Sequence, residues 1–101
     1  MLDEHVKKEQ MEELAEAMLT IRNQEEAFLF FEDIFTIKEL QAVAQRLAVA
    51  QMLKQRVTYQ EIAEKTGAST ATISRVNRSL SYGAGGYQTV LARMEQNGAK
   101  D

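Results

Sequence analysis

The sequence predicts an all-α protein, and three observations carry this prediction. The chain has 101 residues and no Pro, so no residue in it removes a backbone hydrogen-bond donor. Strong helix formers such as Ala, Leu, Glu, Gln, Met and Lys dominate the composition. Apolar residues recur at helical spacings, and no segment shows the alternation of a strand. A chain of this length is expected to form one domain, over residues 1–101.

The first two predicted helices cover about residues 3–21 and 24–35. Asn23 begins the second helix, and Glu26 lies three residues on, as in a capping box. This second helix is apolar on more than one face, so most of its sides must be buried. A domain this small offers little surface to bury it, and we expect a partner subunit to cover it. The first helix carries one apolar face, formed by Met11, Leu14, Met18 and Ile21.

A third helix is predicted from Thr36 to about Gln55. Thr36 and Glu39 have the spacing of a capping box. Its predicted inner face comprises Leu40, Val43, Ala44, Leu47 and Ala50.

The last three helices are shorter. Thr58 and Glu61 open a helix that ends at Gly67, where a left-handed conformation costs glycine nothing. A further helix covers about 70–80, and residues 81–86 are expected to be a loop. The final helix covers 87–97 and stops at Gly98. Its predicted apolar face comprises Tyr87, Val90, Leu91 and Met94.

Residues 58–80 combine a short helix, a turn containing Gly and a second helix, which is the pattern of a helix-turn-helix. Ile62 and Ala63 are expected to face inward, and Ile73 and Val76 to fill the angle between the helices. The other face of the second helix is polar and partly basic. In this motif the second helix places its N-terminal residues on base edges in the major groove, while the first crosses the backbone. We therefore predict contacts to double-stranded DNA from Thr58, Tyr59, Gln60, Ser69, Thr70, Ala71, Thr72, Ser74, Arg75 and Arg78.

Charge is distributed unevenly along the chain. Residues 1–35 hold 3 Lys/Arg against 10 Asp/Glu, a net charge of −7, whereas residues 36–82 hold 7 against 3, a net charge of +4. A polyanion is therefore expected to meet the middle of the chain. The charge distribution alone is equally compatible with charged side chains spread over solvated helix faces without a binding function.

Several functional classes are not expected. The chain has no Cys and one His, His5, so metal sites built on these residues and His-based catalysis are nearly excluded. Serine residues lack a His or Cys partner, and an enzyme is not expected. No apolar run of about 18 residues and no signal peptide are present, so we expect no membrane segment. The absence of Cys makes a cytoplasmic chain the simplest expectation, and no cofactor is expected.

From Glu9 to Met94 the sequence resembles the Trp repressor family, and within it the YerC/YecD-type branch. The resemblance is strongest over 35–40, over 58–80 with its run Gly67-Ala-Ser-Thr-Ala-Thr-Ile-Ser-Arg75, and over the Gly-rich stretch 82–87. It implies a six-helix, Trp repressor-like intertwined homodimer, with dimerisation core helices at 3–57, a helix-turn-helix at 58–80 and a C-terminal helix at 87–97. Such a dimer would act as a sequence-specific transcriptional regulator, most simply a repressor.

The resemblance also implies a candidate ligand pocket at Arg46, Thr72, Arg75, Val76 and Ser79. In the tryptophan-binding members a glycine stands where this chain has Val76, and the branched side chain would fill the space of the indole ring. We therefore expect regulation without L-tryptophan or another amino-acid effector. A repressor gated by an amino acid, and a helical protein-interaction module without DNA binding, are the alternatives.

Overall fold

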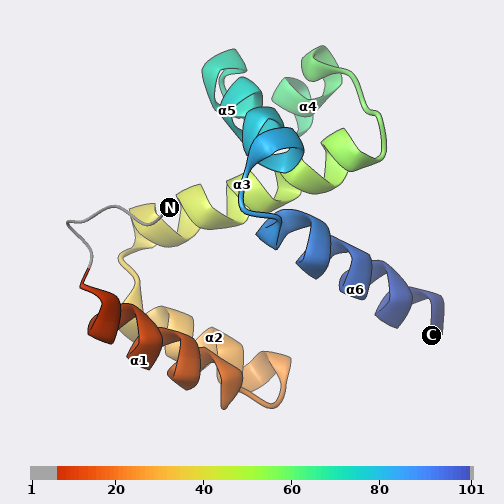
Figure 1. Cartoon of the computed structure of the whole chain (residues 1–101). Helices are drawn as coiled ribbons and strands as arrows, with labels where there is room; N and C mark the ends of the chain where they lie inside the picture. Colours follow the sequence, from red (N-terminus) through yellow and green to blue (C-terminus); the bar gives the residue numbers. More distant parts are fainter. Residues whose placement is uncertain (1–6, 101) are drawn as a thin grey trace. The chain divides into compact units, whose positions relative to one another are not determined.

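The computed structural model describes residues 7–100, with side chains for residues 7–98, and these residues form six α-helices and no strand (Figure 1). The predicted all-α, six-helix fold is confirmed. His5 and the predicted helix start at residues 3–6 lie outside the described part. The chain divides into two compact units, Met1–Leu40 and Gln41–Asp101. This boundary falls inside the predicted dimerisation core 3–57, whose role stays a prediction.

The N-terminal unit contains α1 (Lys8–Leu19) and α2 (Gln24–Ile34). The first helix ends two residues before the predicted Ile21, because the Thr20 hydroxyl and N–H both donate to the Ala17 carbonyl, at 2.6 and 3.1 Å. Such short-range bonds tighten a last helical turn. Asn23 caps α2 as predicted, with its side chain accepting from the Glu26 N–H at 2.9 Å. The Glu26 carboxylate accepts from the Arg22 N–H at 2.9 Å.

Neither α1 nor α2 contains a buried residue. Phe28 and Leu29 are 58% and 60% exposed, which agrees with the predicted excess of apolar surface on this helix. Phe31 and Phe35 contact each other, with ring centroids 5.9 Å apart.

Helix α3 (Ile37–Lys54) begins in the N-terminal unit and continues into the C-terminal one. Its predicted capping box is complete: the Thr36 N–H donates to the Glu39 carboxylate at 2.9 Å, and the Glu39 N–H donates to the Thr36 hydroxyl at 3.1 Å. Two orphan donors at the helix start are therefore satisfied by side chains.

The C-terminal unit adds α4 (Tyr59–Thr66), α5 (Thr70–Tyr82) and α6 (Gly86–Lys100). Every buried residue of the described chain lies in the C-terminal unit, and the packing of these side chains holds its helices together. The predicted inner face of α3 is partly wrong, because Val43 and Ala44 are exposed and the unpredicted Val49 is fully buried. The core comprises Val49, Ala50, Ile62, Ala68, Ile73, Val76 and Leu91.

The last two helices are longer than predicted. The second helix of the predicted motif continues from 80 to Tyr82 and ends where the Gly83 N–H bonds the Ser79 carbonyl at 2.9 Å. A side chain at Gly83 would collide with that carbonyl group, so only glycine suits this position. Helix α6 passes through Gly98, which was expected to stop it, because glycine lowers helix propensity by only about 1 kcal/mol. On its predicted apolar face Leu91 is buried, whereas Val90 and Met94 are exposed.

Candidate nucleic-acid interface

Helices α4 and α5 form the predicted two-helix motif, and side chains fix both of its helix starts. The Thr58 hydroxyl accepts from the Glu61 N–H at 3.2 Å at the start of α4. The Ser69 hydroxyl accepts from the Thr72 N–H at 3.1 Å at the start of α5. Gly67 lies between them with φ +74°, the left-handed conformation that the sequence requires of the turn. The predicted turn chemistry is confirmed.

The inner side of the motif is apolar. Ile62 of α4 and Ile73 of α5 are fully buried, and Val76 is nearly so, as predicted. Ala63 is half-buried against the same core, where its small side chain suits the packing of α5 on α4. The Gln45 amide of α3 donates to the Thr66 carbonyl at 3.0 Å, which satisfies one carbonyl at the end of α4. The motif is thus held to α3 by apolar packing and by one hydrogen bond between the elements.

The predicted DNA-contacting residues lie mostly on the outer side. Thr72 is the exception, because it is half-buried and its hydroxyl accepts a hydrogen bond from Ser69 at 3.1 Å. This local bond gives Thr72 a role in organising the start of α5. The exposed members of the set are Thr58, Tyr59, Gln60, Ser69, Thr70, Ala71, Ser74, Arg75 and Arg78.

The cations of the motif differ in their surroundings. Lys65 on α4 pairs with Glu61 at 3.1 Å. Arg75 and Arg78 on α5 form no ion pair with any other described residue, and both are exposed. Their positive charge is therefore not compensated locally by a described carboxylate and is available to an anion.

A hollow of about 370 Å³ lies on this outer side, and we call it the Tyr59–Tyr82 hollow. Three of its lining residues, Asn77, Ser81 and Tyr82, were not among the predicted contacts, and Ser81 and Tyr82 were missed because residues 81–82 were expected to be loop. The signal was present in the helical spacing from Ser74, which places Ser81 and Tyr82 two turns further along the same side. The hollow is lined by Tyr59, Ser74, Arg75, Asn77, Arg78, Ser81 and Tyr82.

A second hollow, of about 320 Å³, brings together all five residues of the candidate ligand pocket. We call it the Arg46–Arg75 hollow. Val76 belongs to its wall and is only 4% exposed, since the same side chain also packs in the core. Tyr87 of α6 is a sixth lining residue that the sequence did not indicate. The hollow is lined by Arg46, Thr72, Arg75, Val76, Ser79 and Tyr87.

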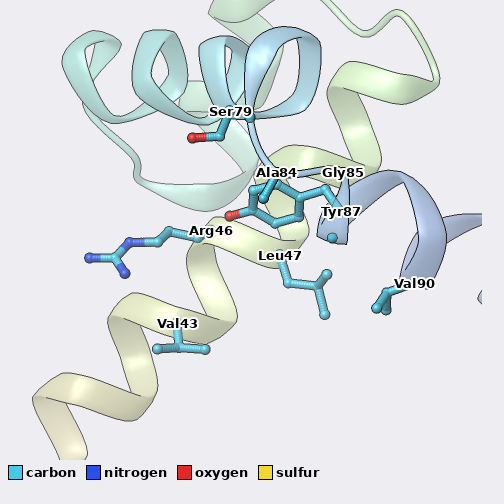
Figure 2. Close-up of a pocket in the computed structure, with 10 residues that line it drawn as sticks. Val43, Arg46, Leu47, Ser79, Ala84, Gly85, Tyr87 and Val90 are labelled. Carbon is cyan, nitrogen blue, oxygen red and sulfur yellow. The ribbon is translucent and has the colours of Figure 1, made fainter. Parts of the chain in front are cut away.

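A larger cavity of about 600 Å³ lies beside Arg46, Ser79 and Tyr87, which also line the Arg46–Arg75 hollow. Figure 2 shows the Tyr87 ring pointing back from the start of α6 toward α3, while the Arg46 side chain extends away from it. Tyr87 is half-buried and packs against the core. Its ring therefore lies at the border of both spaces.

The described residues provide neither a membrane span nor a cluster of metal ligands. No helix among them is both long and apolar enough to cross a membrane. No group of three His, Cys, Asp or Glu residues within this part of the chain is arranged to hold a metal ion.

Known proteins match this chain over nearly its whole length. The family model of the Trp repressor protein matches residues 9–95. The uncharacterized protein YerC of Bacillus subtilis is 46% identical over 87 residues, which are 86% of this chain and 84% of YerC. The crystal structure of a candidate Trp repressor from Staphylococcus aureus is 47% identical, with a TM-score of 0.87, and covers 94% of this chain and 95% of its own. The crystal structure of a TrpR-like protein from Eubacterium eligens is 50% identical, with a TM-score of 0.85, and covers 92% of this chain and 96% of its own.

Proposed function

The chain belongs to the Trp repressor family, and from this premise we propose that it is a sequence-specific DNA-binding transcriptional regulator, acting as a repressor and as a homodimer. The observation that carries the proposal is the outer side of α5, which is exposed, polar and positively charged while its inner side is buried. A helix with one buried and one solvated side is common. Two exposed arginines without a described carboxylate partner, next to short hydroxyl side chains, fit a DNA groove better than they fit mere solvation.

The N-terminal end of α5 suits the major groove. Thr70 and Ala71 are small and uncharged, so the helix backbone can approach base edges closely. Ser74 lies one turn further on the same side. Hydroxyl groups can hydrogen-bond to several base edges, and a methyl group can contact the methyl of thymine.

The dimer is supported by the surface of α2. Phe28 and Leu29 are more than half exposed, and a helix with this much apolar surface is stable only when another surface covers it. A second copy of the chain supplies that surface with twofold symmetry. Two α5 helices about 34 Å apart would then read two half-sites in successive major grooves.

Replacing Thr70, Ser74 and Arg78 together with Ala tests the proposal. We expect the variant to remain a folded dimer and to lose specific binding to DNA fragments recovered with the wild-type chain, since Thr70 and Ser74 are placed at base edges, where each contact contributes about 1–3 kcal/mol, and Arg78 supplies a positive charge to the phosphate backbone. Arg93→Gln on α6 is the matched control, because it also removes one exposed positive charge outside the motif. If the triple variant binds the recovered fragments as well as the wild type, α5 is not the reading helix.

The salt dependence of binding separates a DNA regulator from a protein-interaction module. Each neutralised phosphate gives a slope of about −0.9 in log K against log salt. We expect affinity for duplex DNA to fall steeply between low and moderate salt. An affinity for DNA that salt does not change would favour the interaction module.

We further propose that DNA binding does not depend on tryptophan. Val76 supports this, because its side chain is part of the core and of the wall of the Arg46–Arg75 hollow. A ring that displaced it would disturb a packed site, at a cost of about 1–3 kcal/mol. A ligand-gated regulator is the second candidate, because Arg46 and Arg75 line one hollow of about 320 Å³. Calorimetric titration with tryptophan and related amino acids decides between them: no heat is expected, and saturable heat with one ligand per chain would establish gating.

A further inference from the structure

The Tyr59–Tyr82 hollow has the chemistry of an anion site. It is lined by Arg75 and Arg78 and by five further residues whose side chains can donate a hydrogen bond, and no carboxylate lines it. Charge-assisted hydrogen bonds from guanidinium groups to phosphate oxygens are among the strongest in proteins. Every lining residue except the half-buried Asn77 is exposed.

Tyr82 is the unusual member of this lining. Its side chain is 87% exposed at the C-terminal end of α5, so it contributes little to packing within the chain. Tyr59 faces the same hollow from the first turn of α4 and is 39% exposed. Two tyrosines from opposite ends of the motif therefore border one basic hollow, with their hydroxyl groups available as donors.

The length of α5 determines which part of DNA this hollow can meet. The helix has 13 residues, and at 1.5 Å per residue Tyr82 lies about 18 Å from Thr70 along the axis. The major groove is about 12 Å wide and about 8.5 Å deep. When α5 enters the groove with its N-terminus first, as the second helix of this motif does, and Thr70 is at the base edges, the end of α5 lies outside the groove, at the level of the sugar-phosphate backbone. The first helix of this kind of motif also crosses the backbone, and Tyr59 lies in its first turn.

Resting on the DNA-binding function proposed above, we infer that the Tyr59–Tyr82 hollow binds one phosphate of the DNA backbone and that Tyr82 is a DNA-contacting residue. The Tyr82 hydroxyl donates to a phosphate oxygen that Arg78 also binds. This contact fixes the register of α5 on the duplex and carries no base preference of its own. A second copy of the chain is a poorer occupant, because two such hollows facing each other across a twofold axis would bring four arginines together.

The test uses the full chain and a 20-base-pair duplex carrying a site selected by the wild-type protein from random DNA. Tyr82→Phe keeps the ring and removes the hydroxyl. We expect it to weaken binding about tenfold or more, equally for the selected duplex and for duplexes with one altered base pair, since a hydrogen bond to a charged group contributes at least about one factor of ten. Dimer mass and unfolding midpoint should not change.

Duplexes in which a single phosphate is uncharged show which phosphate Tyr82 contacts. In a series of duplexes, each phosphate in turn is replaced by an uncharged methylphosphonate. We expect one position per half-site to weaken the wild type strongly and to weaken Tyr82→Phe distinctly less, because the tyrosine hydrogen bond to that phosphate is already lost and only the Arg78 contact remains to be removed. Arg78→Gln should reduce the salt slope by about 0.9 per half-site, whereas the control Arg93→Gln should leave it unchanged.

The outcomes separate this inference from the function on which it rests. If the wild type selects and binds DNA, but Tyr82→Phe and Tyr82→Ala bind equally well and no methylphosphonate position couples to them, the phosphate site is wrong and the regulator stands. If Tyr82→Ala makes the dimer dissociate into single chains in sedimentation equilibrium, the residue belongs to a subunit contact and the inference is also wrong. If the wild type binds no duplex at any salt concentration, both are overturned.

Discussion

Among the described residues, every buried side chain belongs to the C-terminal unit, whereas α1 and α2 of the N-terminal unit contain none. Both regions nevertheless contain helices whose N-termini are capped by side chains. Asn23 caps α2 as Ser69 caps α5. The difference lies in what the helices pack against, because α3 completes the core of the C-terminal unit. Local helix signals therefore do not by themselves make a unit self-sufficient.

The two regions also differ in charge. Residues 1–35 are strongly acidic, and residues 36–82 are basic. Acidic surface repels DNA phosphates, and basic surface attracts them. Burial and charge therefore both favour the C-terminal unit as the part that carries the proposed DNA contacts, and the exposed apolar surface favours the N-terminal unit as the part that carries the proposed subunit contact.

The largest effect is expected from placing charge on the exposed apolar surface of α2. Phe28→Asp with Leu29→Asp removes four apolar side chains from the proposed dimer interface, two in each copy, and each buried side chain of this kind contributes about 1.5–3 kcal/mol. Association should weaken by at least about 10⁴-fold, as measured by sedimentation equilibrium. Glu32→Gln on the same helix changes the charge without removing apolar surface, and it should leave the dimer intact. A double variant with unchanged association would show that α2 is not an interface.

A core substitution in the C-terminal unit should act on folding instead. Ile73→Ala removes a fully buried side chain, and we expect it to lower the free energy of unfolding of this unit by about 2–5 kcal/mol in chemical denaturation. The variant should still associate. Gln96→Ala, at an exposed position of α6, should change stability by less than about 0.5 kcal/mol. A loss of association in Ile73→Ala would contradict the separate roles of the two units.

A smaller effect is expected at the turn between α4 and α5. Gly67→Ala meets no steric clash, but its φ of +74° costs a residue with a side chain about 1–2 kcal/mol. Gly86→Ala is the control, because its backbone is not left-handed and its added methyl group also meets no atom. We expect only Gly67→Ala to lower the unfolding midpoint. If the two variants lower the midpoint equally, a side chain at residue 67 does not strain the turn.

The smallest effect concerns the cap of α2. Asn23→Ala leaves the Glu26 N–H without its side-chain acceptor and should destabilise the dimer by about 1 kcal/mol per subunit in thermal unfolding. Asn23→Ser supplies another acceptor and should restore most of the stability. If Asn23→Ser is as unstable as Asn23→Ala, the cap does not explain the effect.

The sequence predicted the fold correctly wherever a single local interaction determines the structure. Capping residues placed the starts of α2, α3 and α4, and Gly67 placed the turn before α5, because each of these signals acts within a few residues. Val49 could not be predicted as core, since α3 is apolar on several sides and only its packing partners select the buried one. Tyr82 was missed because Ser81 and Tyr82 are neutral toward helix formation, and the backbone continues in a helix until Gly83. The sequence therefore predicted the candidate site as far as Arg78 and missed its end at Ser81 and Tyr82.

The mass of the chain in solution tests the central claim most directly, namely that a second copy covers α2 and brings two α5 helices to DNA. One chain has a mass of 11.4 kDa. Sedimentation equilibrium over a range of concentrations should give twice that mass, and the same twofold species should bind one duplex containing two half-sites. A mass of 11.4 kDa at every concentration, with α2 exposed in solution, would contradict the account.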